Sequence, residues 1–164
     1  GVVSAIDNTF ASPINQRPFE HGIDVVMQSA TKYLNGHSDV TAGVVAGRAD
    51  VMQTIELLRR KLGGILDPYA AYLLGRSVKT LAARMAVHNA NGLAVAQAVE
   101  GHPRLRAVHY PGLASHPDHA FAAHLFFFAV GISDDPMTAH KLRRLDANIR
   151  NADEVRKPIL VFAR

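Results

Sequence analysis

The amino-acid sequence predicts an α/β fold. Residues 1–6 and 24–28 are short, apolar and rich in β-branched side chains, which is typical of strands. One helical turn that starts near Pro18 fits between them, and this is about the shortest connection that joins parallel strands. After these segments we expect helices over residues 51–62, 68–79 and 80–99, and then an alternating strand over residues 105–110.

Capping residues support the predicted helices. Asp50 is placed to cap the first helix, and Gly63 to end it. Asp67 and Pro68 repeat the start signal for the second helix, because proline is favoured at the first helical position. The third helix is rich in alanine and ends before Gly101. The first helix carries an apolar stripe made of Ile55, Leu58 and Leu62.

Composition limits the classes of protein to consider. The chain has 164 residues, 48% of them hydrophobic, which suits one domain with a buried core. It lacks an apolar run of about 18 residues, so we predict no membrane span. The absence of cysteine and of a signal-peptide pattern favours a cytoplasmic location. Because the sequence opens on a strand without an initiating methionine, we expect a piece of a longer protein.

The net charge of +4 raises the question of nucleic-acid binding. The basic residues are scattered, and the local clusters at residues 59–61 and 141–144 lie in helical patterns. No aromatic stacking platform accompanies them. We therefore predict no nucleic-acid partner, and steep salt dependence of binding would support the opposite interpretation.

Lys32 and Asp7 are the residues that point to a function. Both follow predicted strands, so parallel pairing would bring them to the edge of the sheet where α/β enzymes bind ligands. A lysine there can form a Schiff base with pyridoxal phosphate, and a carboxylate can keep the pyridine nitrogen protonated. Ser29 and Thr31 alternate around Ala30, so both hydroxyls can donate to the phosphate. A single lysine after a strand is usually a solvated charge, and a single aspartate at a strand end is usually a turn residue. Only the occurrence of Lys32 and Asp7 together favours a cofactor site.

Histidines invite a metal-site interpretation, which the pattern disfavours. His116, His119 and His124 are close in sequence, but Pro117 breaks any helical register and no His-Glu-x-x-His helix occurs. We expect a polar loop and no metal. His37 lies nearer the predicted cofactor, where it could support the residues that bind it, and we interpret it as structural.

Motifs around these residues run in the same order along much of the chain. They are Asp7-Asn-Thr-Phe-Ala-Ser-Pro13, Gln16-Arg-Pro18, Ser29-Ala-Thr-Lys-Tyr-Leu-Asn-Gly-His-Ser-Asp39, Lys79-Thr-Leu81, Arg84-Met85, His88-Asn-Ala90 and Tyr110-Pro-Gly-Leu113. From residue 1 to about residue 124, the chain resembles the trans-sulfuration (Cys/Met metabolism) family of pyridoxal-phosphate (PLP) enzymes. This family includes cystathionine γ-synthase, cystathionine β- and γ-lyases, and methionine γ-lyase.

The resemblance implies a fold-type-I PLP enzyme, similar to aspartate aminotransferase, that assembles as a homotetramer built from dimers. It makes Lys32 the Schiff-base lysine, Asp7 the partner of the pyridine nitrogen, and Ser29 and Thr31 phosphate ligands. The implied reaction is elimination or replacement of a γ- or β-substituent on a sulfur amino acid such as cystathionine, through quinonoid intermediates.

The resemblance also predicts domains. Residues 1–75 would be the C-terminal part of the PLP-binding large domain, with its parallel sheet. Residues 76–124 would begin the small C-terminal α/β domain with a long linking helix. Residues 125–164 lose the resemblance and hold an apolar strand candidate followed by a basic tail. A divergent remnant of the small domain, a shifted reading frame and a deletion join are all compatible with that tail.

Several parts of the family pattern are missing. The glycine-rich phosphate loop, the tyrosine that stacks on the cofactor and a Tyr-x-Arg pair would all lie upstream, and no arginine matches the motif that binds the substrate carboxylate. Each lost charge-assisted hydrogen bond weakens phosphate binding by about 1.5–3 kcal/mol. We therefore expect this chain alone to bind PLP poorly and to turn over little.

Two functions remain open from the sequence. One is a partial trans-sulfuration enzyme of the γ-synthase or γ-lyase type, although the motifs do not fix the reaction. The other is a catalytically incompetent fragment that acts as an oligomerising interaction domain, because truncation would expose apolar surface.

Overall fold

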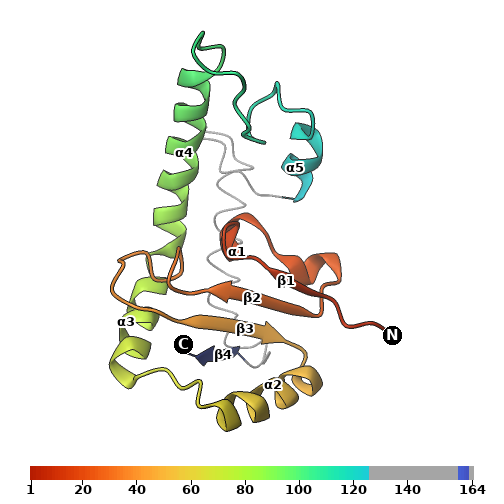
Figure 1. The fold of residues 1–164 in the computed structure, drawn as a ribbon, viewed down its shortest axis with the longest axis vertical. Helices are drawn as coiled ribbons and strands as arrows, with labels where there is room; N and C mark the ends of the chain where they lie inside the picture. Colours follow the sequence, from red (N-terminus) through yellow and green to blue (C-terminus); the bar gives the residue numbers. More distant parts are fainter. Residues whose placement is uncertain (126–158, 163–164) are drawn as a thin grey trace, which may run out of the picture.

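A computed structural model describes residues 1–125 and 159–162 (Figure 1). Its centre is a four-stranded sheet in the order β1-β2-β3-β4. Strand β1 is Ala5–Asp7, β2 is Val25–Ser29, β3 is Gly43–Gly47 and β4 is Ile159–Phe162. The α-helices are α1 at Ser12–Asn15, α2 at Ala49–Leu62, α3 at Pro68–Val78, α4 at Leu81–Val99 and α5 at His119–Leu125, and a 3₁₀ turn spans Pro18–His21.

The sheet is mixed rather than parallel. Strand β1 pairs parallel with β2, as predicted, and Ala5 lies opposite Val25. Strands β3 and β4 then add antiparallel neighbours, so the expected parallel sheet is correct only for the first pair. The predicted first strand is also too long. Val2 and Val3 are exposed and unpaired within the described residues, and the ladder begins where the amide of Val25 donates to the carbonyl of Ser4.

The sequence analysis missed β3. Its residues are two valines and an alanine between two glycines, and glycine disfavours strands. The strand forms because its backbone pairs with β2 along its whole length, from Gly43 opposite Ser29 to Gly47 opposite Val25. Val44 and Val45 then point to opposite faces of the sheet, so both faces offer apolar surface to helices.

Helix α2 lies on one face of the sheet but differs from the prediction at its start and its packing. It begins at Ala49, so Asp50 lies inside its first turn rather than at the cap position, and the Asp50 carboxylate pairs with Arg48 at 2.9 Å. Met52 is the buried contact with Val25 and Val45, whereas Leu58 and Leu62 are exposed. The predicted stripe is therefore wrong after Ile55, because the strand valines contact only the first turns of the helix.

The other predicted helix ends agree closely with the structure. Gly63 ends α2 in the left-handed region, with φ at 78°, where a residue without Cβ is favoured. Asp67 caps α3 by accepting hydrogen bonds from the amides of Tyr69 at 2.9 Å and Ala70 at 3.1 Å. Helix α4 starts after Thr80 and extends away from the sheet as the longest element in Figure 1.

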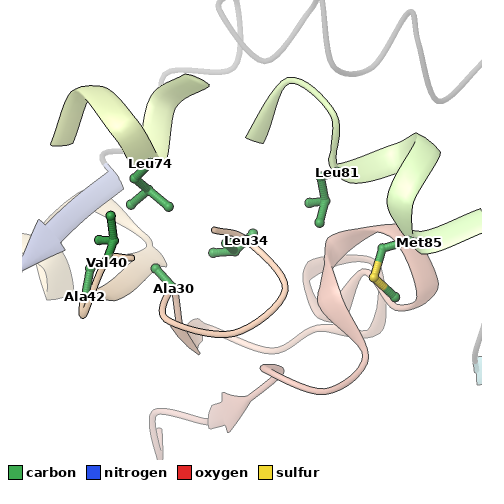
Figure 2. Packing of buried hydrophobic residues seen from close by; sticks show 7 residues of the cluster. All are labelled: Ala30, Leu34, Val40, Ala42, Leu74, Leu81 and Met85. Atoms are coloured by element: carbon green, nitrogen blue, oxygen red, sulfur yellow. The ribbon is translucent and has the colours of Figure 1, made fainter. Parts of the chain in front are cut away.

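The main core lies on the opposite face of the sheet from α2. It joins the segment that follows β2 to helices α3 and α4 (Figure 2). Its buried members are Ala30, Leu34, Val40, Ala42, Leu74, Leu81 and Met85. Figure 2 shows Leu34 between Leu74 of α3 and Leu81 of α4. The packing of α3 and α4 therefore determines where the segment with Lys32 lies.

The strand predicted for residues 105–110 is wrong. Leu105 is about half exposed and its amide donates to the carbonyl of His102 at 2.9 Å, which makes a turn. An alternating pattern forms a strand only when a partner strand is present, and no strand of the described residues pairs with this segment. The strand candidate at residues 125–130 lies almost wholly outside the described residues, and the domain boundary near residue 75 stays a prediction.

None of the helices in the described residues is long and apolar enough to cross a membrane.

Candidate functional site

Asp7 ends β1, and its carboxylate is held by a residue that the sequence analysis did not single out. Oδ1 of Asp7 accepts hydrogen bonds from the Thr9 amide at 3.0 Å and from the Thr9 hydroxyl at 2.5 Å. These two bonds stabilise the charged form, so they lower the pKa of the Asp7 carboxyl. Asp7 is therefore an exposed, ionised carboxylate with a defined orientation at the end of its strand.

Thr9 also connects the ends of the two parallel strands. Its hydroxyl accepts the backbone N–H of Ser29 at 2.7 Å while donating its own proton to Asp7. A hydroxyl can do both at once because it has one proton and two lone pairs. The structure therefore brings Asp7 and Ser29 together at one edge of the sheet, through a buried threonine.

Ser29 and Thr31 differ in what their hydroxyls contact. The Ser29 hydroxyl has no hydrogen-bond partner within the described residues, and the residue is partly exposed. The Thr31 hydroxyl accepts the amide of Ala42 at 3.0 Å and lies 3.3 Å from the Ala42 carbonyl oxygen. The longer contact is weak, so a stronger acceptor could compete for the Thr31 proton. Ser29 is the freer of the two hydroxyls.

Lys32 lies in a turn that follows β2 directly. The Lys32 amide donates to the Ser29 carbonyl at 3.2 Å, and the Lys32 carbonyl accepts from Gly36 at 2.7 Å. A further bond runs from the amide of Asn35 to the carbonyl of Ala30 at 3.0 Å. The backbone of residues 29–36 is therefore one compact turn, with the Lys32 side chain exposed.

Arg84 of α4 holds this turn from the other side. Its guanidinium donates to the carbonyls of Tyr33 at 2.8 Å and Leu34 at 3.3 Å. The same side chain also donates to the carbonyl of Ser77 at 3.0 Å and to the hydroxyl of Thr80 at 3.0 Å. Burial lowers the pKa of this guanidinium, although arginine stays charged in proteins. The Arg84 guanidinium thus bonds the Lys32 turn to both α3 and α4.

The loop after Asp7 is fixed by amides. Asn8 is buried and donates to the carbonyls of Ser12 at 3.3 Å and Gln16 at 3.1 Å. Asn15 exchanges hydrogen bonds with Asn89 of α4, at 3.0 Å and 2.7 Å. Ser12 is fully buried and has a positive φ of 60°, which is unusual for a residue with a Cβ. Helix α4 therefore contacts the loops that follow both parallel strands.

His37, His116 and His119 have hydrogen-bond partners within the described residues. Nδ1 of His37 lies 2.7 Å from the Asn35 carbonyl and 3.2 Å from the Ser77 hydroxyl, so His37 links the Lys32 turn to α3. His119 contacts the carbonyl of Pro111, and His116 accepts the amide of Asp118. Within the described residues no group of three or more His, Cys, Asp or Glu side chains could hold a metal ion.

The residues that the sequence analysis missed are Thr9, Arg84 and Asn89. All three occur in the quoted motifs. Thr9 has a local partner in Asp7 two residues earlier, and Arg84 has one in Thr80 four residues earlier, so part of their role could have been suspected from spacing. Arg84 contacts residues that precede it by about fifty positions, and Asn89 contacts Asn15 at a separation of 74. These distant contacts could be found only from the three-dimensional packing.

The donor set fits a cofactor with a cationic ring nitrogen, an aldehyde and a phosphate. An ionised carboxylate ends one strand, a free hydroxyl ends its parallel neighbour, and a primary amine follows that second strand. Two hollows in the described residues lie away from Asp7 and Lys32. One has a volume of about 420 Å³ and is lined by Val99, His102, Arg104 and Leu105. Asp7 and Lys32 are both exposed, at the end of β1 and just after β2.

Comparison with known proteins decides the family. The sequence profile described as Cys/Met metabolism PLP-dependent enzyme matches residues 1–133. The chain belongs to the Cys/Met metabolism family of PLP-dependent enzymes. The match confirms the resemblance seen in the sequence, and it extends past residue 124, where the resemblance was expected to end.

Relatives within the Cys/Met metabolism family carry different names. The chain is 47% identical to cystathionine γ-synthase 1, chloroplastic, of Nicotiana tabacum over 122 residues, which are 74% of this chain and 23% of that protein. It is 48% identical to L-methionine γ-lyase of Pseudomonas deceptionensis over 124 residues, which are 74% of this chain and 31% of that protein. The chain thus spans about a quarter to a third of these curated relatives.

A solved structure of the family shares the fold. Cystathionine γ-synthase from Xanthomonas oryzae pv. oryzae, in complex with cystathionine, superposes with a TM-score of 0.72 at 40% identity. The match covers 78% of this chain and 33% of that one. The chain is therefore a mixed α/β piece that corresponds to part of a fold-type-I enzyme.

Proposed function

We propose that this chain is part of a PLP-dependent trans-sulfuration enzyme that eliminates or replaces a γ- or β-substituent on a sulfur amino acid such as cystathionine. The observation that carries the proposal is the pairing of strands β1 and β2, with ionised Asp7 ending one and Lys32 following the other. When bound, PLP supplies an aldehyde that joins to a lysine amine, and a ring that withdraws electrons from a bound amino acid.

Asp7 would hold the pyridine nitrogen in its protonated form. A carboxylate does this only while it stays ionised, and the two hydrogen bonds from Thr9 favour that form. Because Oδ1 is occupied by Thr9, Oδ2 is the oxygen available to a cofactor. Thr9 would therefore act through Asp7 and orient its carboxylate.

Lys32 would supply the amine that bonds to the aldehyde and would later move protons on the bound amino acid. The Ser29 hydroxyl, free within the described residues, would donate to the phosphate. The Thr31 hydroxyl would join it by exchanging its weak contact with the Ala42 carbonyl for the stronger phosphate acceptor.

A second function has its own supporting observation. The described helices leave large apolar side chains exposed around the end of α2, where Leu62 is 83% and Ile65 is 67% exposed. Such a surface favours an oligomerising fragment without catalytic competence. In both cases we propose a homo-oligomer, a cytoplasmic location and no nucleic-acid partner, although the tobacco relative is chloroplastic by name.

The proposal is tested by covalent capture of PLP. The chain is mixed with PLP, reduced with borohydride and digested, and labelled lysines are located by mass spectrometry together with the visible absorbance. We expect labelling that saturates at Lys32 and disappears in Lys32→Ala, with Lys61→Ala as the matched exposed control.

Product analysis separates the two functions. We expect weak PLP affinity and little turnover of cystathionine or O-acylhomoserine by this chain alone. Equal labelling of Lys32 and Lys61 would reject the PLP site. Full turnover would reject the incompetent fragment, and would also contradict the expectation that the upstream phosphate ligands are needed.

A further inference from the structure

We propose that Arg84 is a positioning residue for Lys32, through the backbone of the turn that carries it. This inference rests on the proposed role of Lys32 as the amine that bonds to PLP. Arg84 does not need to touch the cofactor. It acts on the two carbonyls that directly follow Lys32, those of Tyr33 and Leu34.

The contacts of Arg84 converge on carbonyl oxygens from two separate segments. One pair belongs to the Lys32 turn, and the third oxygen is Ser77 in the last turn of α3. The carbonyls at the end of a helix carry partial negative charge, so a cation beside the Ser77 carbonyl is favoured even though this oxygen also accepts the amide of Thr80 at 3.2 Å. The planar guanidinium can donate to several acceptors at fixed angles, which a lysine ammonium cannot reproduce.

Gly36 shows how closely Arg84 approaches the turn. Gly36 has a φ of +74°, and a Cβ placed on it would overlap the Arg84 guanidinium. Glycine is favoured here for two reasons: the positive φ, and a Cβ that would force the Arg84 guanidinium to shift away from the carbonyls it bonds. Arg84 thus lies directly against the bend that returns the chain after Lys32.

Neighbouring contacts from α4 give the turn a fixed direction as well as a fixed shape. Met85 is buried in the same core as Leu34. The rings of Tyr33 and His88 meet edge to face at a centroid distance of 5.5 Å. With Leu34 in the core and Tyr33 against α4, the Arg84 bonds determine how the preceding residue, Lys32, leaves the turn.

The experiment compares capture of PLP at Lys32 with capture at Lys61 in the same molecules. The measured quantity is PLP capture at Lys32 divided by PLP capture at Lys61. Unfolding exposes both lysines equally, so it would bring this ratio toward one. The variant Arg84→Lys keeps the positive charge but loses the forked guanidinium donors. The matched control is Arg60→Lys, because exposed Arg60 forms an ion pair with Glu56. Loss of one charge-assisted hydrogen bond is worth about a tenfold effect, so we expect the ratio to fall about tenfold in Arg84→Lys.

A second pair of variants tests the same contact from the turn. Gly36→Ala places a methyl group against Arg84, whereas Gly22→Ala puts the same strain at a φ of +79° with open space around it. We expect the ratio of PLP capture at Lys32 to capture at Lys61 to fall in Gly36→Ala and to stay at the wild-type value in Gly22→Ala.

The rate of amide hydrogen exchange at residues 33–36, measured without PLP, should rise in Gly36→Ala and Arg84→Lys.

The outcomes distinguish this inference from the proposed function. A wild-type ratio near one rejects the PLP site itself, and this inference with it. A high wild-type ratio that Arg84→Lys leaves unchanged rejects only the role of Arg84. Faster hydrogen exchange with an unchanged ratio would also overturn it, because Arg84 would then stabilise the turn without positioning Lys32. A fall in both Arg84→Lys and Gly36→Ala, absent from both controls, supports it.

Discussion

The Lys32 turn and helix α2 are built from different kinds of contact. Helix α2 is supported locally, because Glu56 pairs with Arg59 and Arg60 at three and four positions along the chain and Gly63 ends the helix. The Lys32 turn is held by Arg84, about fifty positions later, and by a core that includes Leu34 and Met85. Local contacts can be predicted from sequence spacing, whereas the turn takes its shape from residues that no pattern relates to it.

The comparison also predicts where the molecule is sensitive to substitution. Removing a distant contact should disturb the Lys32 turn and the fold together. Removing a contact within α2 or at a helix start should change stability only slightly and leave Lys32 in place. Three pairs of substitutions and one single substitution sharpen this contrast, in order of decreasing effect.

The largest effect is expected for Met85→Ala. Met85 is 2% exposed and lies in the core that supports the Lys32 turn, so truncation leaves a cavity beside Leu34. The free energy of unfolding should fall by about 2–5 kcal/mol, measured by urea denaturation. Val87→Ala, on an exposed position of the same helix, should cost far less. Equal costs would mean that the core does not support this turn.

Asn89→Ala comes next, because it breaks the exchange of hydrogen bonds with Asn15. Asn15 is buried, so its amide loses a partner that water cannot easily replace. We expect a loss of about 1–3 kcal/mol in unfolding free energy. Asn91→Ala is the control, since Asn91 is exposed on the same helix. A neutral Asn89→Ala would show that α4 does not fix the loop after Asp7.

Asp67→Ala tests a local contact. Asp67 accepts two backbone amides at the start of α3, and removal of such a cap costs about 1 kcal/mol. Asp50→Ala removes an aspartate that makes no side-chain cap, so its effect on thermal stability should be smaller. Capture of PLP at Lys32 should not change in either variant, and a change would contradict the separation between local and distant contacts.

The smallest effect concerns pH. The guanidinium groups of Arg59 and Arg60 lower the pKa of Glu56 from 4.5 to about 2. Because the folded pKa is below the unfolded one, Glu56 stabilises the protein above pH 4.5, and this contribution disappears as the pH falls toward 2. The Tm of Glu56→Gln should therefore lie slightly below wild type at pH 6 and converge with it near pH 2. High salt should reduce the difference at pH 6.

The particular residues show what the sequence could and could not predict. The start of α3 was predicted because Asp67 and Pro68 act within three residues, and Gly63 was predicted because it needs a positive φ. Strand β3 was missed because it depends on pairing with β2, and residues 105–110 were wrongly predicted because alternation alone provides no partner strand.

In the candidate site too, features set by local sequence could be predicted, and features set by distant contacts could not. The motif around Lys32 and the strand-end Asp7 could be recognised from residue types and spacing, and their family is confirmed. The roles of Asp7, Ser29, Thr31 and Lys32 stay predictions. The bond from Thr9 to Asp7 spans only two residues, but the bond from Ser29 to Thr9 exists only once the two parallel strands lie side by side, so the link between the strand ends could not be found.

The conformation of Ser12 has a consequence for evolution and engineering of this loop. A left-handed backbone costs a residue with a Cβ about 1–2 kcal/mol, and full burial of Ser12 leaves no room for a larger side chain. Glycine would remove that cost, but it would forfeit the hydroxyl that accepts the Ile14 amide at 3.3 Å and would make the unfolded chain more flexible. These terms nearly cancel, so the position should tolerate only serine and glycine, and a library randomised there should converge on those two residues.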